Sequence, residues 1–206
     1  METSEFFNRK AVNLDLTSKC TLACIYCGRA ELKNIPSYYM TEKEFDCYLN
    51  FFHYFTFCGQ ISDPIMHPKL PLFLNKVYKA GKGSGVHVAA SHKPKSFFIE
   101  CFKANPDALW CFGIDGLPQD SHKYRVRQDG MKLFNIMVES AKYLRQKPIW
   151  QYIIFDYNEN DIEEALRLSN LHKVEFKLIM SSRWDKNNYL KPQVNDYSLL
   201  NERNIL

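Results

Sequence analysis

Lys19-Cys20-Thr21-Leu22-Ala23-Cys24-Ile25-Tyr26-Cys27-Gly28 is the most informative stretch of this sequence. It holds three of the seven cysteines of the 206-residue chain, spaced C-x3-C-x2-C. Residues 12–16 just before it alternate apolar and polar side chains, which predicts a short strand. Thiolates are soft ligands that suit iron–sulfur clusters, zinc or copper(I). A [4Fe–4S] cluster normally takes four cysteines, so three would leave one iron open to another ligand.

A zinc site is the alternative interpretation of these cysteines, because Cys3His zinc knuckles also use clustered cysteines. No histidine stands near the loop, and His53 is the first one along the chain. A zinc ion would therefore need a ligand from a distant part of the fold, which favours the cluster.

Composition indicates a globular protein with one core-forming domain. Hydrophobic residues make up 46% of the chain, and no window approaches the eighteen or more apolar residues of a membrane span. The start, Met1-Glu2-Thr3-Ser4, does not have the pattern of a signal peptide. A net charge of +4 with scattered Lys and Arg gives no indication of nucleic-acid binding.

Four further cysteines are scattered through apolar segments: Cys47, Cys58, Cys101 and Cys111. Their spacing does not suggest a disulfide framework, so we expect small buried hydrophobes in a reducing compartment. These features together predict a cytoplasmic protein.

Apolar strand patterns and helix patterns alternate along most of the chain. Thr41 and Glu44 form a capping-box pattern that predicts a helix to about His53, and Met131 to Arg145 predicts another. Strands are predicted at 12–16, 54–58, 85–91, 108–114, 149–155 and 174–180. Strict alternation requires parallel pairing with right-handed crossovers.

Six such units favour a partial (β/α)6 TIM-like barrel with a parallel sheet, because a full eightfold barrel takes about 250 residues. A flavodoxin-like sheet is the alternative, but its first turn would carry glycines for phosphate, not cysteines. We expect one core domain over residues 1–184 and a C-terminal tail over 185–206. A short helix at 197–204 would cap the open edge of the barrel.

C-x3-C-x-aromatic-C directly after a first strand resembles the radical S-adenosylmethionine (SAM) enzyme superfamily. The resemblance implies that Cys20, Cys24 and Cys27 are metal ligands and catalytic residues that hold a [4Fe–4S] cluster, and that SAM chelates the open iron. It implies reductive cleavage of SAM to a 5′-deoxyadenosyl radical, with flavodoxin or ferredoxin as electron donor. Tyr26 would then lie against the adenine.

Active sites of such barrels lie at the carboxyl ends of the strands. After the second strand, the residues at 60–64 read Q-I-S-D-P and are similar to the Q-G-G-E-P segment that binds the SAM amino group. The resemblance implies cofactor contacts from Gln60, Ser62 and Asp63. Ile61 departs from the usual glycine.

Two further segments are similar to the peptide- and protein-modifying (SPASM-type) branch of the superfamily. The residues at 113–116 read G-I-D-G, like the branch's S-I-D-G, and place Asp115 toward ribose or substrate, although Gly113 lacks the usual hydroxyl. Arg125 matches the branch's D-x-Y/F-R pattern, with Arg127 as its competitor, and Asn158 matches the Asn of Y-N-E-x-D near SAM. Ordinary turns, a solvated arginine and a helix cap are the alternative interpretations.

The resemblance to this branch implies a peptide or protein side chain as substrate. The branch usually adds a C-terminal domain with auxiliary clusters, but no cysteine follows Cys111 here. A nucleotide or small-metabolite enzyme, or an activase that installs a glycyl radical, therefore stays open. From another class, a non-catalytic zinc- or cluster-binding interaction module is the alternative.

Overall fold

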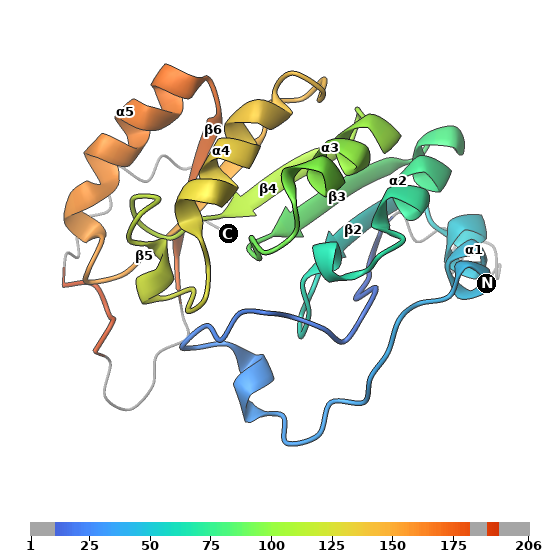
Figure 1. Ribbon diagram of the computed structural model, residues 1–206, viewed down its shortest axis with the longest axis horizontal. Helices are drawn as coiled ribbons and strands as arrows, with labels where there is room; N and C mark the ends of the chain where they lie inside the picture. The colour runs from blue at the N-terminus through green and yellow to red at the C-terminus, as the bar shows by residue number, and fades with distance from the viewer. Residues whose placement is uncertain (1–10, 182–188, 194–206) are drawn as a thin grey trace, which may run out of the picture.

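Six parallel strands form one open sheet in the computed structural model, which describes residues 11–181 and 189–193 (Figure 1). The sheet order is the chain order, β1-β2-β3-β4-β5-β6. The strands are β1 (Ala11–Asn13), β2 (Tyr54–Cys58), β3 (Gly83–Val88), β4 (Leu109–Gly113), β5 (Ile149–Ile154) and β6 (Glu175–Met180). The predicted partial barrel of six β/α units is confirmed.

Each pair of neighbouring strands is connected through a helix. The helices are α1 (Glu42–Phe51), α2 (Leu70–Lys79), α3 (Lys95–Ala104), α4 (Gly130–Ser140) and α5 (Ile162–His172). In Figure 1 the blue segment that follows β1 passes below the arrowheads of β2, β3 and β4. The cysteine-bearing part of the chain therefore lies at the carboxyl ends of the strands, where active sites of such barrels are found.

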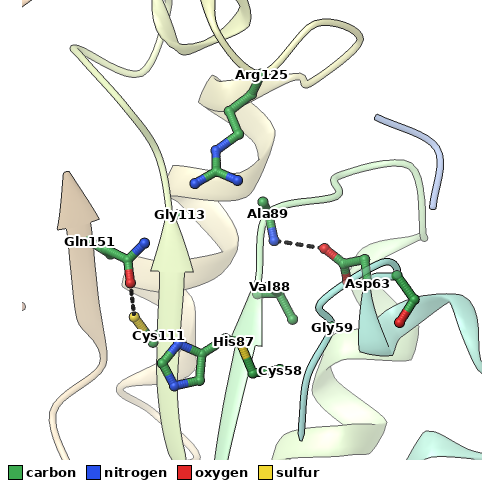
Figure 2. Close-up of a pocket in the computed structure, with 11 residues that line it drawn as sticks. Cys58, Gly59, Asp63, His87, Val88, Ala89, Cys111, Gly113, Arg125 and Gln151 are labelled. Carbon is green, nitrogen blue, oxygen red and sulfur yellow. Dashed lines mark hydrogen bonds between the residues drawn. The ribbon is translucent and has the colours of Figure 1, made fainter. Parts of the chain in front are cut away.

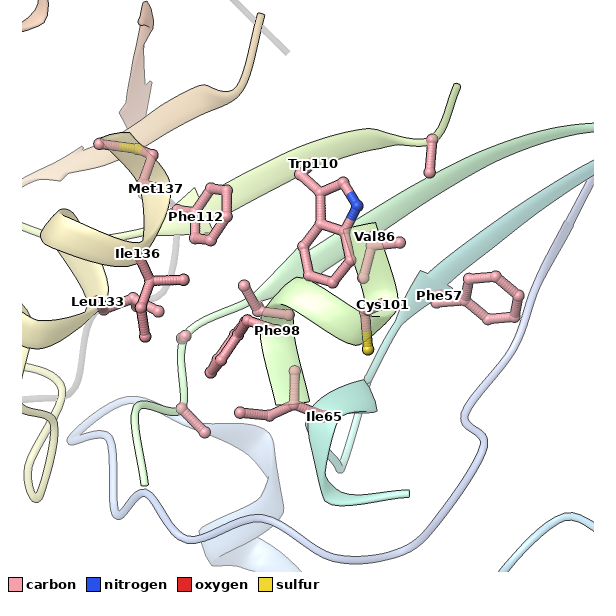
Figure 3. Close-up of a cluster of buried hydrophobic side chains, with 14 of the residues drawn as sticks. Phe57, Ile65, Val86, Phe98, Cys101, Trp110, Phe112, Leu133, Ile136 and Met137 are labelled. Carbon is pink, nitrogen blue, oxygen red and sulfur yellow. The ribbon is translucent and has the colours of Figure 1, made fainter. Parts of the chain in front are cut away.

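The two faces of the sheet differ because successive strand residues point to opposite sides. Apolar and aromatic side chains from each strand point toward the helices, and Figure 3 shows part of this core. On β4, Trp110 and Phe112 are fully buried in it. On the other face the same strands carry small and polar residues, among them His87, Gln151 and Gly113.

Helix boundaries follow local capping. The Thr41–Glu44 capping box is present, and α1 ends at Phe51, close to the predicted boundary. The predicted helix over Met131 to Arg145 instead ends at Ser140 and continues as turns. Leu144 is nevertheless buried against the core. The apolar pattern of the sequence therefore continues past the end of the helix, which explains why the predicted helix was too long.

Part of the C-terminal tail lies against the strand ends. Leu190 packs with Tyr124 and Phe155, and its carbonyl accepts a hydrogen bond from the Asp156 backbone N–H at 3.0 Å. The predicted capping helix at 197–204 lies outside the described residues, and so does most of the tail. Within residues 11–181 and 189–193, no helix is long and apolar enough to cross a membrane.

Candidate active site

The cysteine loop is fixed to a segment about a hundred residues later in the sequence. Two backbone N–H groups of the loop, those of Ala23 and Ile25, donate to the carbonyls of Val126 (3.1 Å) and Tyr124 (3.3 Å). These two bonds stand on either side of Arg125. The loop and this arginine are therefore positioned together by backbone hydrogen bonds.

Cys20, Cys24 and Cys27 line one cavity of about 370 Å³ at the carboxyl ends of the strands. All three are free thiols and half-buried. Burial, together with the nearby Asp63 carboxylate, raises the pKa of Cys20 to about 11. Burial also raises the pKa of Cys24, and the positive charge of Arg125 opposes that rise. Because a metal bound to thiolates displaces their protons, Cys20 and Cys24 would stay protonated without one.

Two arginines, Arg29 and Arg125, line the cavity, and Arg125 is paired with a buried carboxylate. Its Nε donates to Asp115 Oδ2 at 2.6 Å, and the guanidinium lies beside the thiol of Cys24. Arg127, the competing candidate, is exposed. The structure thus selects Arg125 over Arg127 as the arginine that faces the cysteines.

Asp115 is completely buried and both of its oxygens are engaged. Oδ2 accepts from Arg125, and Oδ1 accepts from the Ile153 backbone N–H at 2.8 Å. The carboxylate does not line the cavity, and it orients the guanidinium from behind. Its predicted contact with ribose or substrate stays a prediction.

Gly113 makes room for the guanidinium. A Cβ built on it would lie 3.0 Å from Arg125 Nη2 and 3.3 Å from Arg125 Cζ. Figure 2 shows Arg125 reaching into the cavity above Gly113 and Ala89. The glycine therefore accommodates a guanidinium that a larger side chain would displace.

The segment after β2 is fastened by two carboxylates. Asp15, which follows β1, accepts from the backbone N–H of Gln60 (3.1 Å) and from the hydroxyl of Ser62 (2.6 Å). Asp63 is buried and accepts from the backbone N–H groups of Ala89 and Ala90, both at 2.8 Å. These bonds hold the ends of β1, β2 and β3 together.

Gln60, Ser62 and Asp63 all line the cavity, as the resemblance implies. Asp63 Oδ1 also accepts from the Ile65 backbone N–H at 3.2 Å, so backbone groups engage both oxygens of this carboxylate. Burial raises the pKa of Asp63, and these backbone hydrogen bonds oppose the rise. A contact between Asp63 and the SAM ammonium stays a prediction.

Two other predicted residues lie away from the cavity wall. Tyr26 belongs to a small aromatic cluster, with its ring centroid 6.3 Å from that of Tyr124 and 6.2 Å from that of Tyr189. Asn158 is buried, and its side chain accepts from the Phe155 N–H and donates to the Ile153 carbonyl. Neither lines the cavity, so their contacts with SAM stay predictions.

Several residues of the site carry no motif signal. Arg29 donates to the carbonyls of Ser18 (2.6 Å) and Ile61 (2.5 Å), which connects the cysteine loop to the segment after β2. Gln128 donates to the carbonyls of Ala89 (2.6 Å) and Gly113 (2.8 Å), which joins the ends of β3 and β4. One sequence feature could have predicted part of the cavity wall. Gln151 is a polar residue within an apolar strand pattern, and such residues point away from the core.

The prediction for the four scattered cysteines was partly wrong. Cys101 is buried in the core and Cys111 is buried at the cavity wall. Cys47 is exposed, and Cys58 lines the cavity. Residue type alone could not distinguish these environments. Cys47 and Cys101 lie on helices, where the helical period decides burial, and Cys58 and Cys111 lie on strands, where alternation decides the face.

Comparison with known proteins shows which solved structures share this fold. No family model matches the chain, and no curated protein matches its sequence. Among solved structures, Streptococcus suis SuiB bound to S-adenosylmethionine aligns with a TM-score of 0.73 at 13% identity, over 94% of this chain and 46% of SuiB. The chain has the fold of radical SAM enzymes.

Two other solved structures agree. An anSMEcpe structure with bound AdoMet aligns with a TM-score of 0.61 at 14% identity, over 88% of this chain and 55% of that one. Methylornithine synthase (PylB) aligns with a TM-score of 0.58 at 12% identity, over 88% of this chain and 60% of that one. The chain spans less than half of the length of SuiB.

Proposed function

We propose that the chain is a radical SAM enzyme in which Cys20, Cys24 and Cys27 hold a [4Fe–4S] cluster and the adjoining cavity binds SAM. The observation that carries the proposal is the convergence of three cysteines and Arg125 on one cavity at the carboxyl ends of a six-stranded partial barrel. SuiB and anSMEcpe, which share this fold, were solved with SAM bound.

The arrangement of the thiols supports a cluster over a single ion. A tetrahedral zinc site brings every ligand to about 2.0–2.3 Å from one ion. Across the described parts of the chain, no three Cys, His, Asp or Glu side chains are grouped to hold one metal ion. A cubane cluster binds each cysteine to a different iron, so its ligands surround a larger body than a single ion, and the three cysteines line one cavity of about 370 Å³.

When bound, the cluster supplies the electron that cleaves SAM reductively to a 5′-deoxyadenosyl radical, which abstracts hydrogen from substrate. The chain's own residues bind the cluster and SAM, orient them, and shield them from water. The guanidinium of Arg125 stands beside Cys24 and offsets the negative charge of thiolate ligands. Arg29, Asp15 and Asp63 fix the loops that line the cavity.

We further propose a reduced flavodoxin or ferredoxin as electron donor and a cytoplasmic location. A peptide or protein side chain is the proposed substrate, and the crystal structure of SuiB bound to its precursor peptide SuiA supports it.

Anaerobic purification tests the cluster. We expect a brown protein with about four irons per chain. Cys24→Ala should remove the cluster, whereas the matched change Cys47→Ala, at an exposed cysteine, should keep it. A colourless protein with one zinc ion would overturn the proposal.

Turnover tests the catalytic claim. The reconstituted protein with SAM and dithionite should release 5′-deoxyadenosine, measured by chromatography, and Cys24→Ala should release none. A loaded protein that binds SAM and makes no 5′-deoxyadenosine would leave a cluster-binding module and exclude the enzyme.

A further inference from the structure

The deep part of the cavity is lined by Cys58, His87, Cys111 and Gln151, and Lys177 lies on the same face of the sheet beside Gln151. These five residues, called the floor here, are polar where a closed barrel is filled with apolar side chains. Cys58 pairs in register with His87 across β2 and β3, and His87 pairs with Cys111 across β3 and β4. Register partners on neighbouring parallel strands share a face about 4.8 Å apart. Figure 2 shows these three side chains at the end of the cavity opposite Arg125.

The last two strands extend this surface toward the carboxyl ends of the strands, because Gln151 pairs in register with Gly113 and Cys111 pairs with Ile149. The Sγ of Cys111 lies 3.5 Å from Gln151 Oε1, and Gln151 lines both the deep part of the cavity and its mouth. Gln151 pairs in register with Lys177, which places the lysine on the same face of β6. Lys177 is half-buried, and its positive charge contributes to the lowered pKa of His87 and opposes the rise that burial causes in the pKa of Cys111.

The floor is rich in hydrogen-bond donors that the described residues leave available. Among those residues, Lys177 has no carboxylate within ion-pair distance, and the ring nitrogens of His87 have no hydrogen-bond partner. The side-chain amide N–H groups of Gln151 are also without an acceptor there. Burial and the charge of Lys177 lower the pKa of His87, which leaves its imidazole neutral at pH 7 with one N–H donor.

Acidic groups nearby do not neutralise the floor. Asp63, at the cavity wall, is engaged by three backbone N–H groups, and Asp115 is engaged by Arg125 and Ile153. Glu175 occupies the same face of β6 but is exposed at the first residue of the strand. The deep part of the cavity, about 150 Å³, is therefore lined by the donors of His87 and Gln151 and by the guanidinium of Arg125, and the carboxylate at its wall, Asp63, is already engaged by backbone N–H groups.

We infer that this floor binds an anionic group of the substrate, a carboxylate or a phosphate, with Lys177 supplying the charge and His87 and Gln151 supplying hydrogen bonds. The inference rests on the proposed function for the position of the substrate and deepens it to a substrate class. An acidic side chain of a peptide and a free small acid share this chemistry. The anion would lie on the opposite side of the cavity from the cysteines, which leaves the carbon chain of the substrate between them.

Binding of small probes to the purified full chain, without SAM, tests the inference. The probes are propionate, inorganic phosphate and the N-acetyl methylamide of glutamate, and the neutral controls are propionamide and the corresponding glutamine derivative. The readout is the NMR shift of the His87 imidazole during titration. We expect the anions to shift this signal and the neutral isosteres to leave it unchanged.

Lys177→Met should weaken anion binding about fivefold or more, because it removes the only full positive charge of the floor. Lys147→Met, at an exposed lysine, is the matched control and should bind as the native chain does. Gln151→Glu is a second variant that places a carboxylate in the floor with little change of shape, and it should abolish anion binding. Equal affinity of the native chain, Lys177→Met and Gln151→Glu would overturn the inference.

The probes also identify the source of the anion. Tighter binding of the glutamate derivative than of propionate would indicate a peptide side chain, and tighter binding of phosphate would indicate a phosphorylated small molecule. Native protein that cleaves SAM but ignores every anion would overturn this inference alone. Native protein that binds anions but holds no iron would overturn the proposed function alone.

Discussion

The two faces of the sheet have opposite chemistry although the same six strands supply both. The helix-covered face is built from large side chains such as Trp110, Phe112 and Trp150, all fully buried. The cavity face carries Gly113, Cys111 and Gln151 at the alternate positions of the same two strands. Stability is thus concentrated on one side, which leaves the other side free to accommodate ligands.

The largest effect should come from breaking the helix-covered face. Trp110→Ala should lower the free energy of unfolding by about 3–5 kcal/mol, because it leaves a cavity in the core that Phe102 and Phe112 line. The comparable change on the cavity face, Gln151→Ala, should stay within about 0.5 kcal/mol. Urea unfolding measures both, and similar losses for the two variants would contradict the division between the faces.

A smaller but still large effect is expected from Asp115→Asn. It leaves the Arg125 guanidinium without its buried partner, and we expect a loss of about 3 kcal/mol in the free energy of unfolding. Asp107→Asn, in the exposed pair of Asp107 with Arg145, is the control and should give no measurable loss by the same urea unfolding. Recovery of stability in the double variant Asp115→Asn with Arg125→Met would show that the uncompensated charge is the cause.

The smallest loss of stability is expected from filling the space between Gly113 and the Arg125 guanidinium. Gly113→Ala should cost about 1 kcal/mol, because its Cβ meets Arg125 Nη2 at 3.0 Å and Asp115 holds that side chain in place. It should also weaken SAM binding, measured by equilibrium dialysis with the loaded protein. Gly28→Ala is the control, since nothing lies within 4 Å of its Cβ. A Gly113→Ala variant with native stability and native SAM affinity would show that Arg125 does not depend on the glycine.

The sequence was sufficient for the fold and for the cysteine loop. The strand and helix periods, the Thr41–Glu44 capping box and the order of six units all depend on local patterns, and the structure confirms them. The helix predicted to Arg145 was too long because a turn can bury Leu144 as well as a helix can. That error illustrates that periodicity reports burial more reliably than it reports hydrogen bonding.

The contacts within the site could not be predicted, because they join residues far apart in the sequence. Arg29 and Gln128 reach carbonyls on other loops, and a sequence pattern does not encode such pairings. The polar floor was missed for a related reason. His87, Cys111 and Gln151 each sit singly within an apolar strand, and only the register of the sheet brings them together.

The backbone bonds from Ala23 and Ile25 to the segment around Arg125 also bear on how the protein matures. A nascent chain that ends at Ala104 already contains all three cysteines of the loop, but not the carbonyls of Tyr124 and Val126 that accept hydrogen bonds from it. Such contacts between distant parts of a chain form late, after the cost of closing a long loop has been met. Acquisition of the proposed cluster should therefore follow the synthesis of β4 and the segment after it, and the colour of a cluster-bearing protein would report how far folding has proceeded.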